Sequence, residues 1–390
     1  KPLAHFQFLE TSSFTGREKV SWLEMRSKAY IISQSPFKED FESLAKIFLD
    51  PTLVTLYNAL SILPKGNISK SSMKLQGCLH CKDEPAGKVR VFAMVDIWTQ
   101  NVLKSLHDGL FDFLRSLPND GTFDQWASVN RAVEKAKKSK VSFGYDLSAA
   151  TDRLPIDIQS HILDTIFGCD IGKSWKNLLV GREYVLKSPS YGNHTVSYAV
   201  GQPMGALSSW AMLALTHHLI VQYCANQIYN NKLWFDNYEL LGDDIVIFDK
   251  EVATRYLSVM RDLGVEINLS KSVISINGEV IEFAKKTILN GVNVSSMPWA
   301  AMMTTKSPMA LASLLFSLYN RLDISNSLSW VNRWCFYSHI SKVNLDIVKL
   351  DLLKIFYSTD IEKYAILIDK ILAKFDNISV RNISEIAKKF

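Results

Sequence analysis

The sequence predicts an α+β fold in which a small antiparallel sheet lies between helical segments. Short β-prone segments gather near the middle of the chain, where residues 238–248 form two apolar runs around Gly242-Asp243-Asp244. Toward both ends, apolar residues recur at helical spacing. A chain of 390 residues also exceeds the size at which one hydrophobic core stops growing, so two or three subdomains are expected. Central strands between helical flanks predict the α+β class.

The first third of the chain is predicted to be mostly helical. Residues 1–75 have helical character, and the amphipathic run 41–49 is closed by Pro51. Residues 76–90 contain glycine, proline and lysine and are predicted to form a loop. A further amphipathic helix is expected over 97–117.

The middle and end of the chain alternate between strand and helix patterns. A glycine- and proline-containing loop at 201–205 opens onto a long apolar helix. The other elements expected from periodicity are, in order, a strand at 141–147, a helix at 155–167, a hairpin at 185–200 with its turn at 191–193, a helix at 206–228, two strands within 238–248, a helix at 252–263, a strand at 265–269, strands at 281–283 and 287–294, and helices from about 305 to the end.

Composition and charge are those of a folded protein with a mild preference for polyanions. Hydrophobic residues make up 47% and charged residues 21%, which excludes a disordered chain. The net charge of +5 leans toward a polyanionic partner. The run 131–140 carries five basic residues against one acid, so it forms either a solvated helix face or a surface that faces nucleic acid. No apolar run reaches the length of a membrane span, so none is expected.

The five cysteines are scattered, which argues against a disulfide framework and for a reducing compartment. Cys78-Leu-His80-Cys81 has metal-ligand spacing, but no second pair follows at the spacing of a zinc finger. Structural zinc is therefore not the favoured interpretation.

The sharpest chemical signal is a pair of adjacent carboxylates between two apolar strands. Asp243 and Asp244 follow Gly242 at the tip of a predicted hairpin, where an ordinary turn explains the glycine and one aspartate. Two carboxylates beside a buried hairpin repel each other unless a cation or solvent compensates them. On this feature alone, a plain turn and a metal site both remain open.

Asp146 supplies a third carboxylate at the end of another predicted strand, and Asp152 follows in the same segment. A helix start near Ser148 offers a plainer explanation, because Asp and Ser cap helices. Carboxylates from separate strands are nevertheless the hard oxygen ligands that Mg²⁺ prefers together with substrate phosphates. Asp146, Asp243 and Asp244 therefore suit a two-metal nucleotidyl-transfer site.

Three further segments are candidates for contacts with substrate. Lys88 and Arg90 lie at alternate positions of a β-prone run and would face one side, where they hold a triphosphate or remain solvated. In 201–210 the glycines allow close approach of a ligand and the serines offer hydroxyls, although serine at a helix start is usually a cap. Lys271 is placed to protonate a leaving pyrophosphate, and a surface lysine fits the pattern equally well.

The order of these segments resembles the polymerase motifs of viral RNA-dependent RNA polymerases, most closely those of the narnavirus-like mitoviruses. Gly-Asp-Asp alone is common, whereas the whole set in this order is specific. The matching segments span about residues 76–290 and are, in order, 87–100, 146–155, 201–210, 215–218, 242–244, 268–272 and 282–285.

The resemblance implies a right-hand polymerase with fingers, palm and thumb and a small antiparallel palm sheet. We expect fingers at 1–140 with an insertion at 156–200, palm at 141–155 and 201–290, and a helical thumb at 291–390. The implied activity replicates a positive-strand viral RNA genome by transferring nucleotides from NTPs onto an RNA 3′-hydroxyl. RNA template, RNA product and NTPs are the implied partners, and no protein partner is inferred.

The resemblance also implies roles for individual residues. Asp146 and Asp243 hold two Mg²⁺ ions, for which Mn²⁺ is an alternative, with Asp244 alongside, and Lys271 is the candidate general acid. The basic run directly precedes the strand that carries Asp146, which places an RNA-facing surface, with Lys137 and Lys138 as contacts, on a level with a solvated helix face. The remaining assignments are triphosphate binding by Lys82, Lys88 and Arg90, ribose selection by Asp152 with Ser208 or Ser209, and RNA binding by Gly201, Gly205, Lys137 and Lys138.

Two other interpretations stay open: a reverse transcriptase, and a catalytically inactive RNA-binding remnant. Glycine before the paired acids and the presence of Asp152 favour synthesis of RNA from ribonucleotides, and the intact acids argue against decay. Mitoviruses replicate in mitochondria, so a mitochondrial location is implied. Because the chain begins at Lys1 and is short for such a polymerase, further fingers elements are expected upstream.

Overall fold

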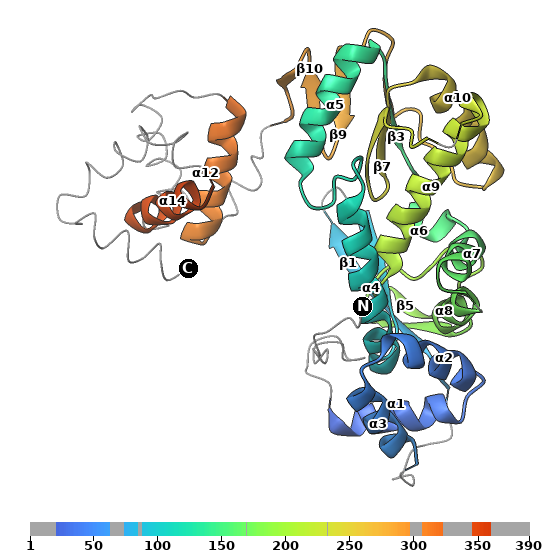
Figure 1. Ribbon diagram of the computed structural model, residues 1–390. Coiled ribbons are helices and arrows are strands. Elements are labelled where there is room, and N and C mark those ends of the chain that lie inside the picture. The colour runs from blue at the N-terminus through green and yellow to red at the C-terminus, as the bar shows by residue number, and fades with distance from the viewer. Residues whose placement is uncertain are drawn as a thin grey trace. The chain divides into compact units, whose positions relative to one another are not determined.

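The structure is a computed structural model that describes residues 21–62, 74–84, 88–168, 170–231, 233–296, 306–322 and 345–359 (Figure 1). Contacts divide the chain into two units, residues 1–294 and 295–390. All strands in the described ranges belong to the first unit. Helices combined with small, mostly antiparallel sheets confirm the predicted α+β class.

Helices fill much of the first unit, as apolar periodicity predicts. They include α1 (Trp22–Ser33), α2 (Lys38–Phe48), α3 (Pro51–Ile62), α4 (Ile97–Ser116), α6 (Ala150–Arg153), α7 (Ile156–Phe167) and α8 (Ile171–Val180). In α2 the residues Phe41 and Phe48 recur on one buried face. Pro51 begins the next helix, because the fixed backbone of proline suits a first helical turn. The helices predicted at 97–117 and 155–167 are confirmed as α4 and α7.

A buried ion pair fixes the start of α4. Asp96 accepts hydrogen bonds from the backbone N–H groups of Trp98 and Thr99. Arg182 donates to the same carboxylate at 2.6 Å, and both side chains are fully buried. Burial raises the pKa of Asp96, but Arg182 and Thr99 outweigh it and hold that pKa below its ordinary value.

A four-stranded sheet, here called the N-terminal sheet, packs on these helices in the order β2-β1-β4-β5. Its strands are β1 (Gly77–Glu84), β2 (Lys88–Met94), β4 (Glu183–Ser188) and β5 (Gly192–Ser197). The loop predicted at 76–90 is therefore wrong over most of its length. Leu79 pairs with Ala93 and both are buried against the helices, which stabilises a hairpin that local composition does not indicate. The hairpin predicted at 185–200 is confirmed by β4 and β5.

A second four-stranded sheet, here called the central sheet, has the order β6-β7-β3-β8. Its strands are β3 (Ser142–Asp146), β6 (Tyr238–Leu241), β7 (Asp244–Ile247) and β8 (Val273–Ser275). The strands predicted at 141–147 and within 238–248 are confirmed. The strand predicted at 265–269 is wrong, because this segment makes a single bridge, from Ile267 to Leu147, and β8 pairs with β3 instead.

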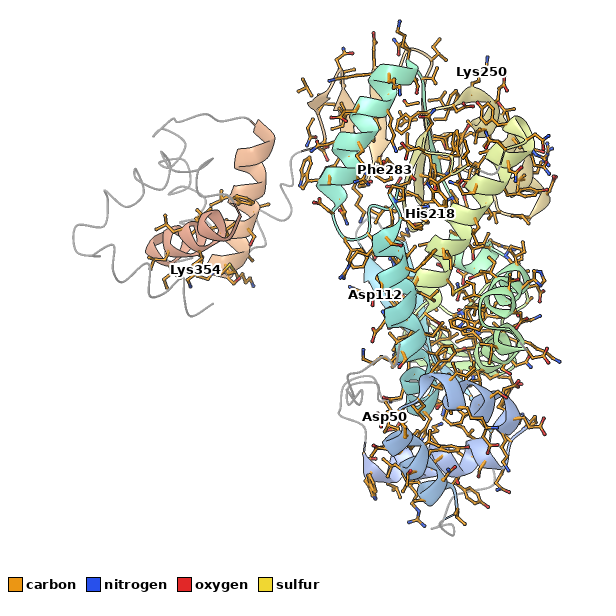
Figure 2. The ribbon with its side chains drawn as sticks, viewed as in Figure 1. Asp50, Asp112, His218, Lys250, Phe283 and Lys354 are labelled. Atoms are coloured by element: carbon orange, nitrogen blue, oxygen red, sulfur yellow. The ribbon has the colours of Figure 1, made fainter. Side chains whose placement is uncertain are left out.

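Helices cover one face of the central sheet, and a helix with a small sheet covers the other (Figure 1). On one face α9 (Ser209–Tyr229) and α10 (Lys250–Asp262) pack against Tyr145 and Ile245. On the other face lie α5 (Gln125–Ser139) and the sheet of β9 (Val280–Phe283), β10 (Lys286–Leu289) and β11 (Val292–Asn293). His218 of α9 and Phe283 of β9, labelled in Figure 2, belong to these opposite layers. The central sheet is thus enclosed on both faces.

The second unit contains two described helices, α12 (Pro308–Leu322) and α14 (Leu345–Thr359). They pack together, and Leu311, Leu315 and Leu352 are among their buried residues. The helices expected from about 305 onward are confirmed over these ranges, and the remainder lies outside the described residues. Among the described residues, no helix combines the length and apolar character needed to cross a membrane.

Candidate active site

A cavity of about 480 Å³ opens where β3 ends and β7 begins. Asp146, Asp243, Asp244 and Lys271 line it together, although they come from three segments that are distant in the sequence. The cavity is also lined by Gln125, Gly144, Tyr145, Leu147, Trp210, Leu241, Val273, Glu282, Ala284 and Lys285.

The register of the central sheet places two of the carboxylates side by side. Asp146 is the direct partner of Asp244 in the antiparallel pair of β3 and β7. Residues directly opposite in such a pair project to the same face. The next pair on this face is Gly144 with Val246, and a methyl group built on Gly144 would lie 3.1 Å from the Glu282 carbonyl oxygen of β9. Both carboxylates therefore project to the face that β9 covers.

Asp244 is crowded by other negative charges. Burial raises its pKa to about 6. The backbone N–H of Ala284 donates to Oδ2 of Asp244 at 2.7 Å and opposes this rise. The carboxylates of Asp243, Glu282 and Asp146 contribute to the rise, each less than burial does. A raised carboxyl pKa among like charges indicates negative charge that a bound cation would compensate.

The turn that carries Asp243 has little conformational freedom. Gly242 has φ of +64°, a left-handed conformation that favours glycine. A methyl group built on Gly242 would lie 2.8 Å from Nε1 of Trp210, so the indole lies directly against the turn. Trp210 in turn stacks on Phe111 with ring centroids 5.5 Å apart. Glycine at position 242 is therefore required by packing as well as by turn geometry.

The segment 268–272 returns to the strand that carries Asp146. The N–H of Asn268 donates to the Asp146 carbonyl oxygen at 2.8 Å. The N–H of Asp146 donates to Oγ of Ser272 at 3.2 Å. Lys271 lies between these two anchors and is exposed at the cavity. Its role as a proton donor stays a prediction.

The basic residues of the β1–β2 hairpin share one face but do not line this cavity. Lys82 is the direct partner of Arg90, and Lys88 lies two residues before Arg90 on β2, on the same face. Arg90 is exposed and forms an ion pair with Glu84 at 3.0 Å. Asp146 and Asp243 thus meet in one cavity without Arg90, and a triphosphate-binding role for the hairpin stays a prediction.

Asp152 and the two serines assigned to ribose selection also lie away from the cavity lining. Asp152 is on α6, and burial raises its pKa. Ser208 is buried; its hydroxyl accepts a hydrogen bond from Trp175 at 2.9 Å, and its N–H donates to Nδ1 of His107. Ser209 is buried as well. Packing thus accounts for Ser208, and its hydroxyl is already engaged within the fold.

The glycines of the 201–205 loop support close contacts between backbones. A methyl group on Gly201 would lie 2.3 Å from the Asp152 carbonyl carbon. One on Gly205, where φ is +128°, would lie 2.9 Å from the Ala93 carbonyl oxygen. The loop is also bonded to β2, because the Ala93 N–H donates to the Met204 carbonyl oxygen at 2.7 Å. Packing therefore explains both glycines without RNA.

The basic residues on α5 form two sets, one that pairs with a buried carboxylate and one that is exposed. Arg131 and Lys135 both donate to the fully buried carboxylate of Glu239, at 2.7 and 2.9 Å. Two of the five basic residues therefore hold α5 against β6. Lys137 and Lys138 are exposed near the end of the helix, so an RNA-binding role for them stays a prediction.

Cys78 and Cys81 do not act as a pair. They lie at positions of β1 that project to opposite faces of the sheet. Sγ of Cys78 instead lies 3.5 Å from Nε2 of His80, on the same face. Burial raises the pKa of the Cys78 thiol, so its metal-binding thiolate form is disfavoured.

Glu282, Lys285 and Trp210 line the cavity, but the sequence assigned them no role. The first two belong to 282–285, a segment that matches a polymerase motif and places an acid and bases beside a predicted strand. That combination is the signal that would have identified them. Trp210 shows no comparable signal, because an aromatic residue on an apolar helix usually packs in a core.

The donor atoms around the cavity fit hard divalent cations. Asp146, Asp243, Asp244 and Glu282 supply carboxylate oxygens, the ligands preferred by Mg²⁺ and Mn²⁺. Within the described ranges, no three His, Cys, Asp or Glu side chains are already arranged as a metal site. Because Mg²⁺ prefers octahedral oxygen coordination, it would take further oxygen ligands, and substrate phosphates supply them in phosphoryl-transfer sites.

The arrangement of sheets and helices is that of the right-hand polymerases. The crystal structure of the RNA-dependent RNA polymerase of a human picobirnavirus matches over 77% of this chain and 64% of that chain, with a TM-score of 0.51 and 15% identity. Its insertion-loop deletion mutant matches equally, with a TM-score of 0.51 and 16% identity. These likenesses establish the fold, and the predicted right-hand architecture is confirmed.

The family model for the mitovirus RNA-dependent RNA polymerase matches residues 9–388. The chain belongs to this family, which confirms the resemblance. It is 46% identical over 214 residues to the RNA-directed RNA polymerase of Cryphonectria parasitica mitovirus 1, covering 54% of this chain and 25% of the relative. It is also 39% identical over 175 residues to an uncharacterized mitochondrial protein of Arabidopsis thaliana, covering 44% of this chain and 68% of that protein. The chain thus matches about a quarter of the viral relative's length.

Proposed function

We propose that this chain is an RNA-directed RNA polymerase that extends an RNA 3′-hydroxyl with nucleoside triphosphates. The convergence of Asp146, Asp243, Asp244 and Lys271 on one cavity carries the proposal. Membership of the mitovirus polymerase family supports it independently. An ordinary turn would explain the glycine and one aspartate, but not three carboxylates and a lysine that meet around one cavity from three segments of the chain.

The carboxylates would hold two Mg²⁺ ions, or Mn²⁺ in their place. When bound, such ions lower the pKa of the attacking hydroxyl and neutralise the triphosphate. Asp146 and Asp243, both exposed to the cavity, are the proposed principal ligands, and Asp244 is fixed beside them by the Ala284 N–H. The Lys271 ammonium would give its proton to the leaving pyrophosphate, because a neutralised leaving group departs more readily.

The proposed partners are an RNA template, its product and NTPs. Binding along a single-stranded backbone depends on positive charge, so it is expected to weaken as salt rises. The hairpin face with Lys82, Lys88 and Arg90 is the proposed contact for the triphosphate. A viral relative and mitochondrial plant relatives support replication of a positive-strand RNA genome in mitochondria as the biological setting.

Primer extension on an RNA template in Mg²⁺ tests the activity. Asp146→Asn and Asp243→Asn are each expected to lower synthesis by about 10³-fold or more, because metal ligation supplies several kcal/mol of charge stabilisation. Asp262→Asn is the matched control, since Asp262 is exposed at the end of α10. Full activity in Asp243→Asn would contradict the proposed chemistry.

The same assay separates the alternatives. Preference for dNTPs over NTPs would identify a reverse transcriptase and overturn the proposal. Template binding without synthesis in either Mg²⁺ or Mn²⁺ would identify an inactive RNA-binding remnant.

A further inference from the structure

Helix α9 contacts the Gly242 turn through two side chains, Trp210 and His217. They are seven residues apart, which is two helical turns, so both project from the same face of α9. Trp210 packs directly against Gly242. His217 reaches the backbone of the same residue with a hydrogen bond. The turn is therefore held by packing and by a polar contact from one rigid element.

The hydrogen bonds of His217 determine which ring nitrogen carries the proton. Nδ1 lies 2.8 Å from the Gly242 carbonyl oxygen, and Nε2 lies 2.7 Å from the Tyr256 hydroxyl. A carbonyl oxygen only accepts, so Nδ1–H donates to Gly242 and Nε2 accepts from Tyr256. Burial lowers the pKa of His217 to about 4, so this neutral form is the one present near pH 7.

Tyr256 connects this contact to the second strand of the site. Its ring stacks on Tyr145 with centroids 5.7 Å apart and nearly parallel planes. Tyr145 directly precedes Asp146 on β3 and lines the cavity. One buried tyrosine thus contacts both the histidine that holds Gly242 and the residue next to Asp146.

We infer that His217 is a positioning residue, which fixes the Gly242 carbonyl and thereby sets the direction of the Asp243 and Asp244 carboxylates relative to Asp146. The inference rests on the proposed function, in which those carboxylates hold the metal ions. Groups that orient metal ligands commonly change metal affinity or activity by about 10- to 100-fold when removed. His217 touches neither substrate nor metal, so its effect is transmitted through the turn.

A pair of amide substitutions isolates the Gly242 bond. The amide nitrogen of asparagine replaces Nδ1, whereas the longer glutamine places its amide near Nε2. His217→Asn therefore keeps the donor to Gly242, and His217→Gln keeps only a partner for Tyr256. We expect His217→Gln to lower kcat about 10- to 100-fold and to raise the half-saturating Mg²⁺ concentration about tenfold, with KM for NTP within about twofold. His217→Asn should stay within about fivefold of wild type.

His218 provides the matched control on the same helix. It is equally buried and has two polar partners, Tyr238 and Asp120, neither of which belongs to the turn. His218→Asn and His218→Gln should therefore alter the midpoint of thermal unfolding. The two variants should not differ from each other in kcat or in the half-saturating Mg²⁺ concentration. Tyr256→Phe is a milder variant, because it removes one hydroxyl and keeps the stacked ring, and it should give a partial loss.

Tb³⁺ binding supplies a readout that does not require synthesis. Tb³⁺ binds carboxylate oxygens, and Trp210 and Tyr145 line the cavity where they can sensitise its luminescence. His217→Gln should weaken Tb³⁺ binding about tenfold and His217→Asn much less. Asp243→Asn is the control, because it shows whether Tb³⁺ binds at the carboxylates of the cavity. A wild-type chain that binds Tb³⁺ without making RNA would overturn the proposed function and leave the positioning role of His217 standing. Equal Tb³⁺ affinities for the two His217 variants, or no cavity binding in wild type, would overturn the positioning role.

Discussion

Replacing Asp244 by asparagine is expected to stabilise the metal-free protein at pH 8 while lowering RNA synthesis. Burial raises the pKa of Asp244 from 3.8 to about 6. The unfolded chain therefore ionises first, so the folded state binds more protons between these values. Its free energy of unfolding falls as pH rises through that window. At about 1.4 kcal/mol for each tenfold change in proton affinity, the loss levels off near 3 kcal/mol above pH 6. Asparagine carries no charge and avoids this cost.

Urea unfolding in EDTA at pH 4 and pH 8 measures the effect. The gain for Asp244→Asn should be about 3 kcal/mol at pH 8 and below about 1 kcal/mol at pH 4, where most of the cost has disappeared. Asp243→Asn is the control, because that carboxylate is exposed and its neutralisation should give a smaller gain. Mg²⁺ should stabilise wild type more than Asp244→Asn. Equal stability of wild type and Asp244→Asn at pH 8 would refute the argument that burial and the neighbouring carboxylates raise the pKa of Asp244.

Three more perturbations have expected outcomes. Arg182→Met leaves the buried Asp96 carboxylate without its ion-pair partner, so the free energy of unfolding in urea should fall by about 3–5 kcal/mol. The double variant with Asp96→Asn should recover most of this loss. An absence of recovery would contradict the role of the ion pair. Gly242→Ala forces a side chain at φ +64° against an indole ring, so kcat in primer extension should fall at least about tenfold, and an unchanged kcat would show a freer turn. Replacing Lys137 and Lys138 by glutamine should reduce the salt slope of RNA binding, measured by fluorescence anisotropy in KCl, by about 1.5; an unchanged slope would indicate a merely solvated helix face.

The central hairpin and the long helices could be predicted because their signals are local. Apolar runs on both sides of Gly242-Asp243-Asp244 indicate two buried strands, and the structure has them at 238–241 and 244–247. The meeting of these acids with Asp146 also followed from the order of strands and turns. The exact partner in the sheet did not, because the register that sets Asp146 beside Asp244 is fixed by tertiary packing.

The features that escaped prediction depend on distant segments. The strand β1 has the composition of a loop, and its buried pairing of Leu79 with Ala93 compensates for that. The hydroxyl of Ser208 is occupied by Trp175, which lies 33 residues earlier in the chain. Arg131 looked like a free surface charge because its partner Glu239 lies 108 residues away. No local pattern reveals such long-range partners.

The buried carboxylate of Glu239 constrains when the chain can fold. Its partners Ser128, Arg131 and Lys135 precede it by 104 to 111 residues, so their pairing closes a long loop. Closing a loop of this length costs conformational entropy and slows folding. Burying Glu239 before its partners are in place would leave an unpaired charge in the interior, which is strongly destabilising. During synthesis, α5 therefore has to wait for β6 to leave the ribosome before either can be buried. In a fragment that stops short of residue 239, the charges of Arg131 and Lys135 would remain in water. The central sheet would remain unassembled.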